Sequence, residues 1–325
     1  MEGWKLTEGF ITDTHLTETE IWQCFNTIFS SKSKNQASYK FGLVRAMVDN
    51  LYNVNDDLVL TFDQIYDTFA RIYWNLVIKH NLRQTDNSHT QSAIERILRE
   101  IRQKYQIPPD FAYDKLPADI QYETLFKVKN EGKKYVLGAL YGDTKGKFYE
   151  FSKEKEYLRF NPPVYRFFQR YQQVILRLNN YEWAKFLAKN NSITSGFIDA
   201  IENISKRTSL EYYLEILERY TVHRCFYCGK NLEKSIVHVD HFIPWSYIHS
   251  DNLWNLVLSC KQCNLSKRDR IPAQKYLNLL LARNGELIQS GQIRFETDYS
   301  PKRLQELYEY AEVNGYSSGW EVPSR

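Results

Sequence analysis

Two short stretches, "CFYCGK" at residues 225–230 and "CKQCN" at residues 260–264, each contain a C-x-x-C pair. Between them the chain reads "HVDHFIPWSYIHSDNLWNLVLS", residues 238–259. A C-x-x-C pair places two thiolates on one turn, and two such pairs complete a tetrahedral metal site. The chain has five cysteines, and four of them form these pairs: Cys225, Cys228, Cys260 and Cys263. We therefore predict a structural Zn²⁺ that joins the two ends of the enclosed segment, in preference to four unrelated core cysteines.

The enclosed segment also carries groups that a structural zinc site does not need. Asp240 and His241 are adjacent, and asparagines follow them. Carboxylate and amide oxygens suit a hard cation such as Mg²⁺ or Mn²⁺, whereas Zn²⁺ prefers the thiolates. A neutral imidazole beside a hard cation can take a proton from water. A hard cation with an adjacent base is the minimum requirement for hydrolysing a phosphodiester.

Taken in order, these motifs resemble the HNH endonuclease family, which has a ββα-metal fold. The resemblance covers residues 225–272 and rests on C-x-x-C, Asp-His, an Asn-Leu step, and C-x-x-C-Asn followed by Lys267. The rest of the chain resembles no family that we can identify. The expected fold class is therefore α+β, with an HNH nuclease module and its zinc site set into a mainly helical chain.

The resemblance implies a role for each matching residue. Asp240 and Asn264 correspond to ligands of the catalytic metal, with Asn264 in the place where other members use a final histidine. His241 corresponds to the general base that activates water. Asn255 corresponds to the middle asparagine, whose side chain ties down a loop and positions the base. Asn252 also precedes a leucine and competes for this role, but the spacing of Asn255 to the second cysteine pair fits better.

The basic residues near the second cysteine pair are candidates for contacts with nucleic acid. Lys267 is similar to the family residue that meets a phosphate. Lys261, Arg268 and Arg270 lie on or beside the same expected helix, where they would bind phosphates without sequence preference. His238 is expected to support the metal, to contact DNA or simply to pack.

The strand that carries Asp240 and His241 raises a question of geometry. Neighbouring residues of a regular strand face opposite sides, so the two side chains would point apart. A bend or bulge after Asp240 would let both address one phosphate. Pro244 is expected to end the strand soon afterwards.

Four segments in the first hundred or so residues have apolar residues at helical spacing, which predicts the core of a helical bundle. They are residues 17–29, 38–53, 61–80 and 90–106. The first begins with a Thr-x-x-Glu capping signal at Thr17 and Glu20. Residues 162–178 predict a further helix with proline in its first turn, and more helical segments follow to about Tyr220.

Residues 133–160, "KKYVLGALYGDTKGKFYEFSKEKEYLRF", have aromatic and branched residues around the turn signal "GDTKG". This pattern predicts a small antiparallel β element. Its lysines are a candidate nucleic-acid face, or a solvated strand edge, because acidic residues are interleaved with them. These lysines are Lys133, Lys134, Lys145, Lys147, Lys153 and Lys155.

Composition sets the broad class of protein. A hydrophobic fraction of 43% and an aromatic fraction of 15% argue for a folded globular chain. The net charge of +4 does not by itself imply a polyanionic partner. The first residues lack a secretory signal pattern, and no apolar run approaches the roughly 20 residues needed to cross a bilayer. We expect a cytoplasmic protein without a membrane partner.

The changes in pattern along the chain predict four parts. They are a helical domain for targeting or regulation at residues 1–110, a mixed β-hairpin and helical region at 111–215, the HNH nuclease module at 216–275 and a C-terminal helical extension at 276–325. The N-terminal helices are expected to choose the target, to bind a protein partner or to self-associate.

The leading hypothesis is a metal-dependent HNH endonuclease that hydrolyses DNA, with a role in restriction or antiviral defence inferred by analogy alone. One alternative is a nucleic-acid-binding module held by zinc and without catalysis. The other is an RNA nuclease. Together, Asp240, His241, Asn255 and Asn264 favour catalysis, since a binding module has no need of all four.

Overall fold

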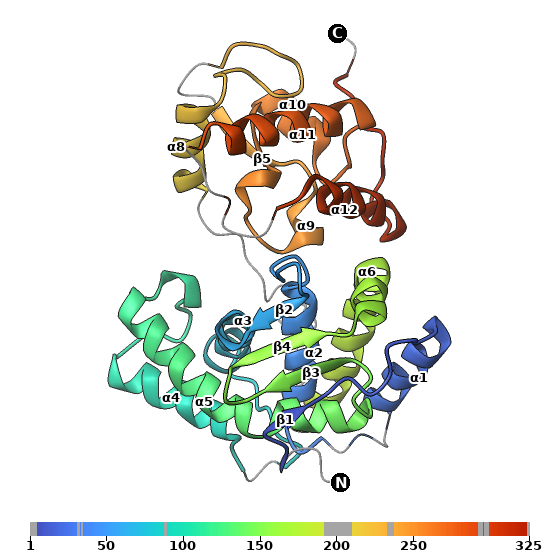
Figure 1. Ribbon diagram of the computed structural model, residues 1–325. Coiled ribbons are helices and arrows are strands. Elements are labelled where there is room, and N and C mark those ends of the chain that lie inside the picture. The colour runs from blue at the N-terminus through green and yellow to red at the C-terminus, as the bar shows by residue number, and fades with distance from the viewer. Residues whose placement is uncertain are drawn as a thin grey trace. The chain divides into compact units, whose positions relative to one another are not determined.

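The computed structural model describes residues 5–30, 33, 35–87, 90–191, 210–232, 237–291, 295 and 299–323. The chain forms two compact units, an N-terminal unit of residues 1–206 and a C-terminal unit of residues 207–325 (Figure 1). Helices predominate and each unit contains a small sheet, so the predicted α+β class is confirmed. The finer division into four parts stays a prediction.

The N-terminal unit combines helices with an antiparallel sheet. Its helices are α1 (Glu18–Ile28), α2 (Tyr39–Asp49), α3 (Phe62–Trp74), the π-helical turn η2 (Asn75–Lys79), α4 (Ala93–Lys104), the short η3 (Tyr113–Lys115), α5 (Ala118–Asp143) and α6 (Pro162–Leu187). Its strands are β1 (Glu8–Gly9), β2 (Val59–Thr61), β3 (Tyr149–Ser152) and β4 (Tyr157–Phe160). The strand order is β1-β3-β4-β2, and every neighbouring pair is antiparallel.

Capping boxes set the start of three of these helices. Thr17, Thr61 and Ser92 each accept a hydrogen bond from the backbone N–H three residues later, and the Glu or Gln there bonds back to the cap. This reciprocal pairing satisfies backbone donors that a helix start otherwise leaves open. The predicted helices of the first 106 residues are confirmed, and α6 begins with prolines in its first turn as expected.

The β element predicted for residues 133–160 is correct only in its second half. Residues 133–143 are the end of α5, because Val136, Leu137 and Leu140 recur at helical spacing and are buried. The "GDTKG" signal therefore connects α5 to β3, and the hairpin turn lies at residues 153–156.

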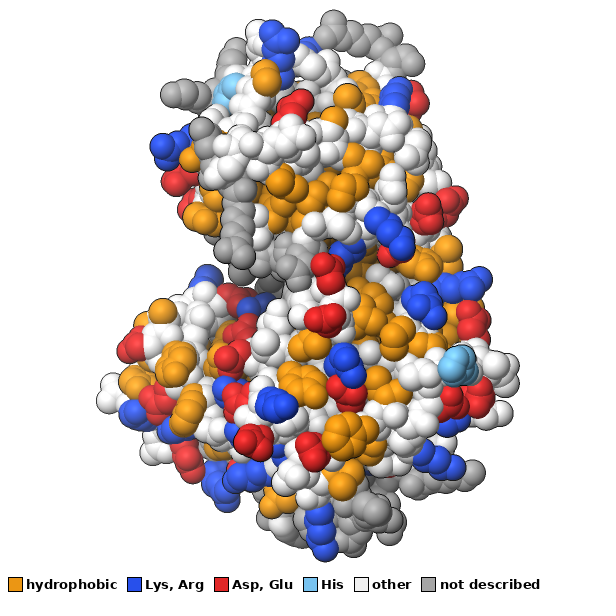
Figure 2. Space-filling view, in the orientation of Figure 1, with side chains coloured by type: hydrophobic (Ala, Val, Ile, Leu, Met, Phe, Trp, Pro, Cys, Tyr) orange, Lys and Arg blue, Asp and Glu red, His pale blue; other side chains and the backbone are white. Residues whose placement is uncertain are grey.

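The lysines of this stretch do not form a continuous basic face. Lys133 Nζ lies 2.6 Å from a carboxylate oxygen of Glu156, and Lys134 Nζ lies 2.6 Å from one of Glu131. Lys147 pairs with Glu20 at 3.2 Å. Figure 2 shows positive and negative side chains interspersed over the visible face of the N-terminal unit. Such surface pairs leave little net positive charge for a polyanion.

Close helix packing in the N-terminal unit depends on glycine at one position. A Cβ atom on Gly132 of α5 would lie 2.4 Å from Cε1 of Tyr66, a buried residue of α3. Only a residue without a side chain allows these two helices to approach this closely. This contact joins residues 62–74 to residues 118–143, so both sides of the predicted boundary at residue 110 share one core.

The C-terminal unit is built around a strand pair followed by a helix. Its elements are α8 (Glu211–Tyr220), β5 (Val237–His241), α9 (Trp245–Ile248), η5 (Leu253–Asn255), β6 (Leu256–Cys260), α10 (Lys261–Lys267), α11 (Gln274–Gln289) and α12 (Pro301–Val313). Strands β5 and β6 are antiparallel, and α10 follows β6 directly. This order of elements is the expected ββα arrangement.

The end of the chain is part of the same unit. The backbone of Ile271 donates to Ser317 O and accepts from Trp320 N, at 2.8 and 3.0 Å. The indole of Trp320 is buried and lies 5.0 Å from the ring of Tyr227. Among the described helices of both units, none has the length and apolar character required to cross a membrane.

Candidate metal centre and nuclease site

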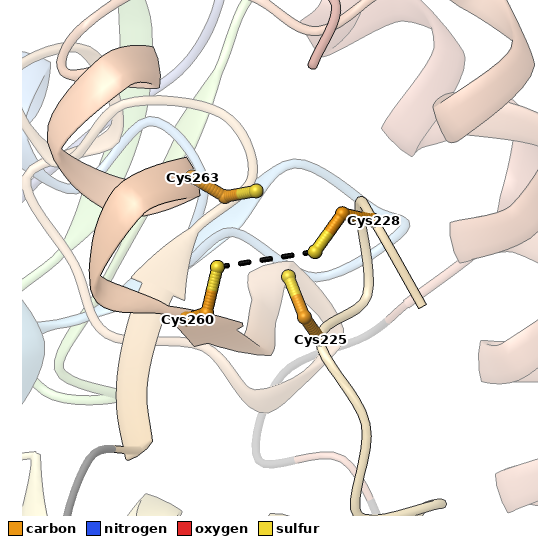
Figure 3. A group of neighbouring side chains, drawn as sticks. All are labelled: Cys225, Cys228, Cys260 and Cys263. Atoms are coloured by element: carbon orange, nitrogen blue, oxygen red, sulfur yellow. Dashed lines mark hydrogen bonds between the residues drawn. The ribbon is translucent and has the colours of Figure 1, made fainter. Parts of the chain in front are cut away.

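The four paired cysteines converge as predicted. Their sulfur atoms all lie within 4.8 Å of one another, and Cys228 Sγ is 3.9 Å from Cys260 Sγ (Figure 3). Cys260 ends β6, Cys263 lies in the first turn of α10, and the other pair belongs to the turn after α8. Tetrahedral zinc with Zn–S bonds of about 2.3 Å requires sulfurs about 3.8 Å apart. The geometry of the cluster therefore fits a zinc ion.

The chemistry of the cluster also calls for a cation. Burial raises the pKa of the Cys225 and Cys263 thiols, so without a metal these two groups stay neutral. A divalent cation offsets this penalty by stabilising the thiolates. Soft sulfur ligands select zinc over magnesium or calcium. The described residues thus provide a site for a metal such as zinc.

Strand β5 carries Asp240 and His241 without a bulge between them. Asp240 pairs with Val257 and His241 pairs with Leu256, so the ladder stays in register to the end of the strand. No bend or bulge therefore separates the two residues, because regular pairing continues through both. Their side chains point to opposite faces of the strand pair and meet different partners. Pro244 is the N-cap of α9, just beyond the strand.

On one face, the carboxylate of Asp240 is buried between a phenol and an ammonium group. Tyr227 donates its hydroxyl to Oδ2 at 2.6 Å, and Lys267 Nζ lies 3.2 Å from the same oxygen. Lys267 Nζ also donates to the carbonyl oxygen of His241 at 2.7 Å. The Asp240 residue is 6% exposed and Lys267 is fully buried.

The position of Lys267 corrects the expectation that it meets a phosphate. A fully buried ammonium group needs a nearby carboxylate, and Asp240 supplies it. Lys267 thus acts inside the module and not on its surface. Asn264 lies one helical turn earlier on α10, on the face that Lys267 presents to Asp240. Its half-buried side chain has no hydrogen-bond partner among the described residues.

On the other face, the imidazole of His241 is held by a carboxylate that the sequence analysis did not single out. His241 Nε2 lies 2.7 Å from Asp251 Oδ1, and both side chains are largely buried. The loop that carries Asp251 is in turn fixed by Tyr213 of α8, whose hydroxyl donates to Asp251 O at 2.8 Å. The available signal was an acidic residue in the loop between the Asp-His pair and the Asn-Leu step.

Asn255 binds the segment that follows His241. Its Oδ1 accepts from Ile243 N and its Nδ2 donates to Ile243 O, both at 2.9 Å. Its backbone oxygen accepts from Phe242 N at 2.8 Å, and the residue is fully buried. The competing candidate Asn252 instead donates to Ser250 Oγ at 2.7 Å. Asn255 is therefore the asparagine with the expected contacts to the loop after the base.

The remaining predicted residues lie at or near the surface. Lys261, Arg268 and Arg270 are exposed on α10 and the turn after it. His238 is half-buried on β5, and its backbone oxygen accepts from Ser259 Oγ at 3.3 Å. These four residues are at least partly exposed, whereas Lys267 is the only basic residue of the predicted set that lies in the interior.

Residues 225–273 match the model of a family described as HNH endonuclease. The match begins at the first cysteine of the metal cluster and includes Asp240, His241, Asn255 and Asn264. Comparison with curated proteins and with solved structures gives no match. This part of the chain is therefore similar to HNH endonucleases and has four cysteines placed to hold a metal ion, which supports a nuclease that acts on nucleic acid.

Proposed function

We propose that the protein is an endonuclease that hydrolyses DNA phosphodiester bonds and depends on Mg²⁺ or Mn²⁺. The observation that carries this proposal is the buried imidazole of His241, held by Asp251 within the segment that matches the HNH family. A buried histidine with one nitrogen fixed by a carboxylate is suited to remove a proton from water. DNA is the proposed substrate, and a comparison with RNA is part of the test.

The zinc cluster and the base lie at opposite ends of the strand pair. Cys260 is opposite Val237, and His241 is four residues further along β5. At about 3.4 Å per residue, these positions are about 14 Å apart along the strand. The cluster is therefore structural, and the reaction requires a second, hard cation.

Asp240 and Asn264 would hold that cation, since they offer a carboxylate and an unpaired amide from facing elements. When bound, such a cation stabilises negative charge on the phosphate and on the leaving oxygen. The salt bridge to Lys267 orients the Asp240 carboxylate before any cation arrives. Tyr227 further restricts its rotation through the hydrogen bond to Oδ2.

His241 supplies the base in this mechanism. Because Asp240 and His241 point to opposite faces of the regular ladder, the end of β5 would have to turn on binding for both to address one phosphate. In this tautomer Nε2–H donates a hydrogen bond to Asp251, which leaves Nδ1 as the acceptor for a proton from water. The resulting hydroxide attacks phosphorus in line with the leaving oxygen. Asn255 keeps the backbone after His241 in place through Ile243. General-base catalysis of this kind contributes roughly 10²–10⁴ in rate.

Substrate binding is assigned to the exposed cations. Lys261, Arg268 and Arg270 would contact the phosphate backbone without reading sequence. The N-terminal unit lies outside the family match, and we assign it target choice or regulation. By analogy with other HNH enzymes that carry additional domains, a role in restriction or antiviral defence follows from this assignment.

One observation favours the alternative of a binding module without catalysis. The carboxylate of Asp240 is already neutralised by Lys267 and is nearly inaccessible. In that case the Asp240–Lys267 pair would stabilise the fold instead of holding a cation. DNA binding with no cleavage in either Mg²⁺ or Mn²⁺ would support this alternative.

The test is cleavage of supercoiled plasmid, single-stranded DNA and RNA over a Mg²⁺ and Mn²⁺ titration. We expect nicking that depends on the added cation. His241→Ala should lower the rate by roughly 10²–10⁴ while zinc content, thermal stability and DNA binding stay near those of the unmodified protein. Full activity of His241→Ala would contradict the proposed base.

A further inference from the structure

A hollow of about 670 Å³ lies in the C-terminal unit, and its lining differs from the residues assigned to catalysis. It is lined by residues of α8, the first cysteine turn, β6 and α11, and Leu217, Val257, Leu258 and Leu287 form apolar parts of its wall. None of Asp240, His241, Asn255 and Asn264 lines it. Its volume falls within the range of sites for small molecules.

Three arginines converge on this hollow. Arg219, Arg224 and Arg283 line it, together with one carboxylate, that of Glu286. Within the described parts of the chain, no ion pair joins any of these guanidinium groups to a carboxylate. Arg45 of the N-terminal unit, by contrast, is 2.8 Å from a neighbouring aspartate oxygen. The described lining of the hollow, with three arginines and one glutamate, therefore carries net positive charge.

Arg283 contributes most to this argument. Its Nη2 makes only long contacts to the carbonyl oxygens of Leu253 and Trp254, at 3.5 and 3.4 Å. Its Nε is buried and has no partner among the described residues. Desolvation lowers the pKa of this guanidinium to about 10. Burial of a cation without a counter-ion is unfavourable, and a bound anion would offset that cost.

The rest of the lining indicates what kind of anion fits. Guanidinium groups bind phosphate through paired hydrogen bonds. Tyr220 and Phe226 also line the hollow, and the guanidinium of Arg219 lies 5.5 Å from the Tyr220 ring centre. Aromatic and aliphatic surfaces of this kind accept a nucleobase by stacking.

We propose that this hollow binds a nucleotide, with its phosphate on Arg219, Arg224 and Arg283 and its base against the apolar wall. The same chemistry is offered by a free nucleotide and by an unpaired nucleotide of a strand. The proposal does not depend on cleavage, because the hollow shares no residue with the nuclease site.

The test measures binding of fluorescently labelled AMP by anisotropy, with the zinc-loaded full-length protein and no added Mg²⁺ or Mn²⁺. Arg219→Ala/Arg224→Ala should raise the Kd by about tenfold or more, since both residues are exposed and each offers a charged hydrogen bond. Ala282→Trp, at another exposed lining position, should block the hollow without changing its charge. Lys230→Ala removes a nearby exposed cation outside the hollow and should leave the Kd unchanged.

Competition identifies the source of the nucleotide. Displacement by unlabelled AMP alone assigns a free nucleotide, and displacement by a short single-stranded oligonucleotide assigns a strand. Either result supports the proposal if the arginine and Ala282→Trp variants bind more weakly. Three outcomes would overturn the proposal. They are no binding of AMP or of the oligonucleotide, binding that both variants retain, and equal displacement of labelled AMP by inorganic phosphate. Loss of plasmid nicking has no bearing on these outcomes.

Discussion

His241 has two ring nitrogens, and a carboxylate holds one of them. Nε2 is held at 2.7 Å by Asp251, which orients the ring for the proposed proton transfer from water. Asp251 does not need to touch the substrate for this effect. We therefore regard it as a positioning residue that works through His241.

Substitution of Asp251 should separate orientation from charge. We expect Asp251→Ala to lower kcat by about 10- to 100-fold with little change in KM, the usual cost of losing such a partner. Asp251→Asn keeps an acceptor oxygen but not the charge, so its kcat should fall between those of Ala and the unmodified protein. Steady-state kinetics on a labelled duplex measures both values, and an unchanged kcat in Asp251→Ala would refute the role.

Lys267 and Lys261 lie on the same short helix but should behave in opposite ways. Removal of the buried Lys267 leaves Asp240 without its cation, so Lys267→Ala should lower the free energy of unfolding by about 3–5 kcal/mol. Lys261→Ala, at an exposed site, should change it by less than about 0.5 kcal/mol. Lys261→Ala should instead reduce the slope of log K for DNA binding against log salt concentration by about one, the loss of one phosphate contact. Urea unfolding and binding at several salt concentrations check this contrast, and the reverse pattern would refute it.

At the scale of elements, one strand pair supports both sites. The end of β6 carries Cys260 of the metal cluster, and the end of β5 carries His241. Helix α10 starts at the cluster and returns Lys267 to Asp240. The cluster therefore fixes the start of the helix that completes the environment of Asp240.

Loss of the cluster should thus disrupt the nuclease site as well as the metal. We expect one zinc ion per chain, and its loss in Cys260→Ser, with a large drop in thermal stability because binding of structural zinc supplies folding free energy. Cys24→Ser, which changes the lone cysteine of the N-terminal unit, is the matched control and should retain zinc. Elemental analysis measures the zinc content, and thermal unfolding measures the stability. A folded, active protein without zinc would contradict the structural role of the cluster.

At the scale of the whole molecule, the chain is two compact units, and the family match covers part of the second. The match ends near the start of α11, but the unit continues to the last described residues. Trp320 packs on Tyr227, whose hydroxyl binds Asp240. Residues near the end of the chain thereby support the candidate nuclease site.

Fragments of the chain test this dependence. Residues 207–325 should fold alone, bind zinc and show weak cleavage without target choice, because this unit has its own core. Residues 207–275 should be unstable, since they lack Trp320 and the backbone pairing to Ile271. Circular dichroism, zinc content and nicking assays compare the two. Equal stability of the two fragments would refute the role of the C-terminal residues. A product pattern of the longer fragment that equals that of the full chain would refute target choice by the N-terminal unit.

Features with a local cause could be predicted from the sequence alone. Paired cysteines at short spacing predict a metal cluster because two ligands on one turn already have the required geometry. Thr17 predicts the start of α1 because a capping box involves only neighbouring residues. The order of Asp240, His241, Asn255 and Asn264 likewise predicted the segment that matches the HNH family.

Features that depend on distant segments were decided only by the tertiary structure. The burial of Lys267 depends on its packing against β5, and the contact of Asp251 with His241 depends on how a loop folds back. Residues 133–143 read locally as part of a hairpin, yet they are helical, because their apolar side is buried in the core of the N-terminal unit. Spacing along the chain records which neighbours a residue has in sequence, whereas burial and charge pairing depend on which segments meet in space.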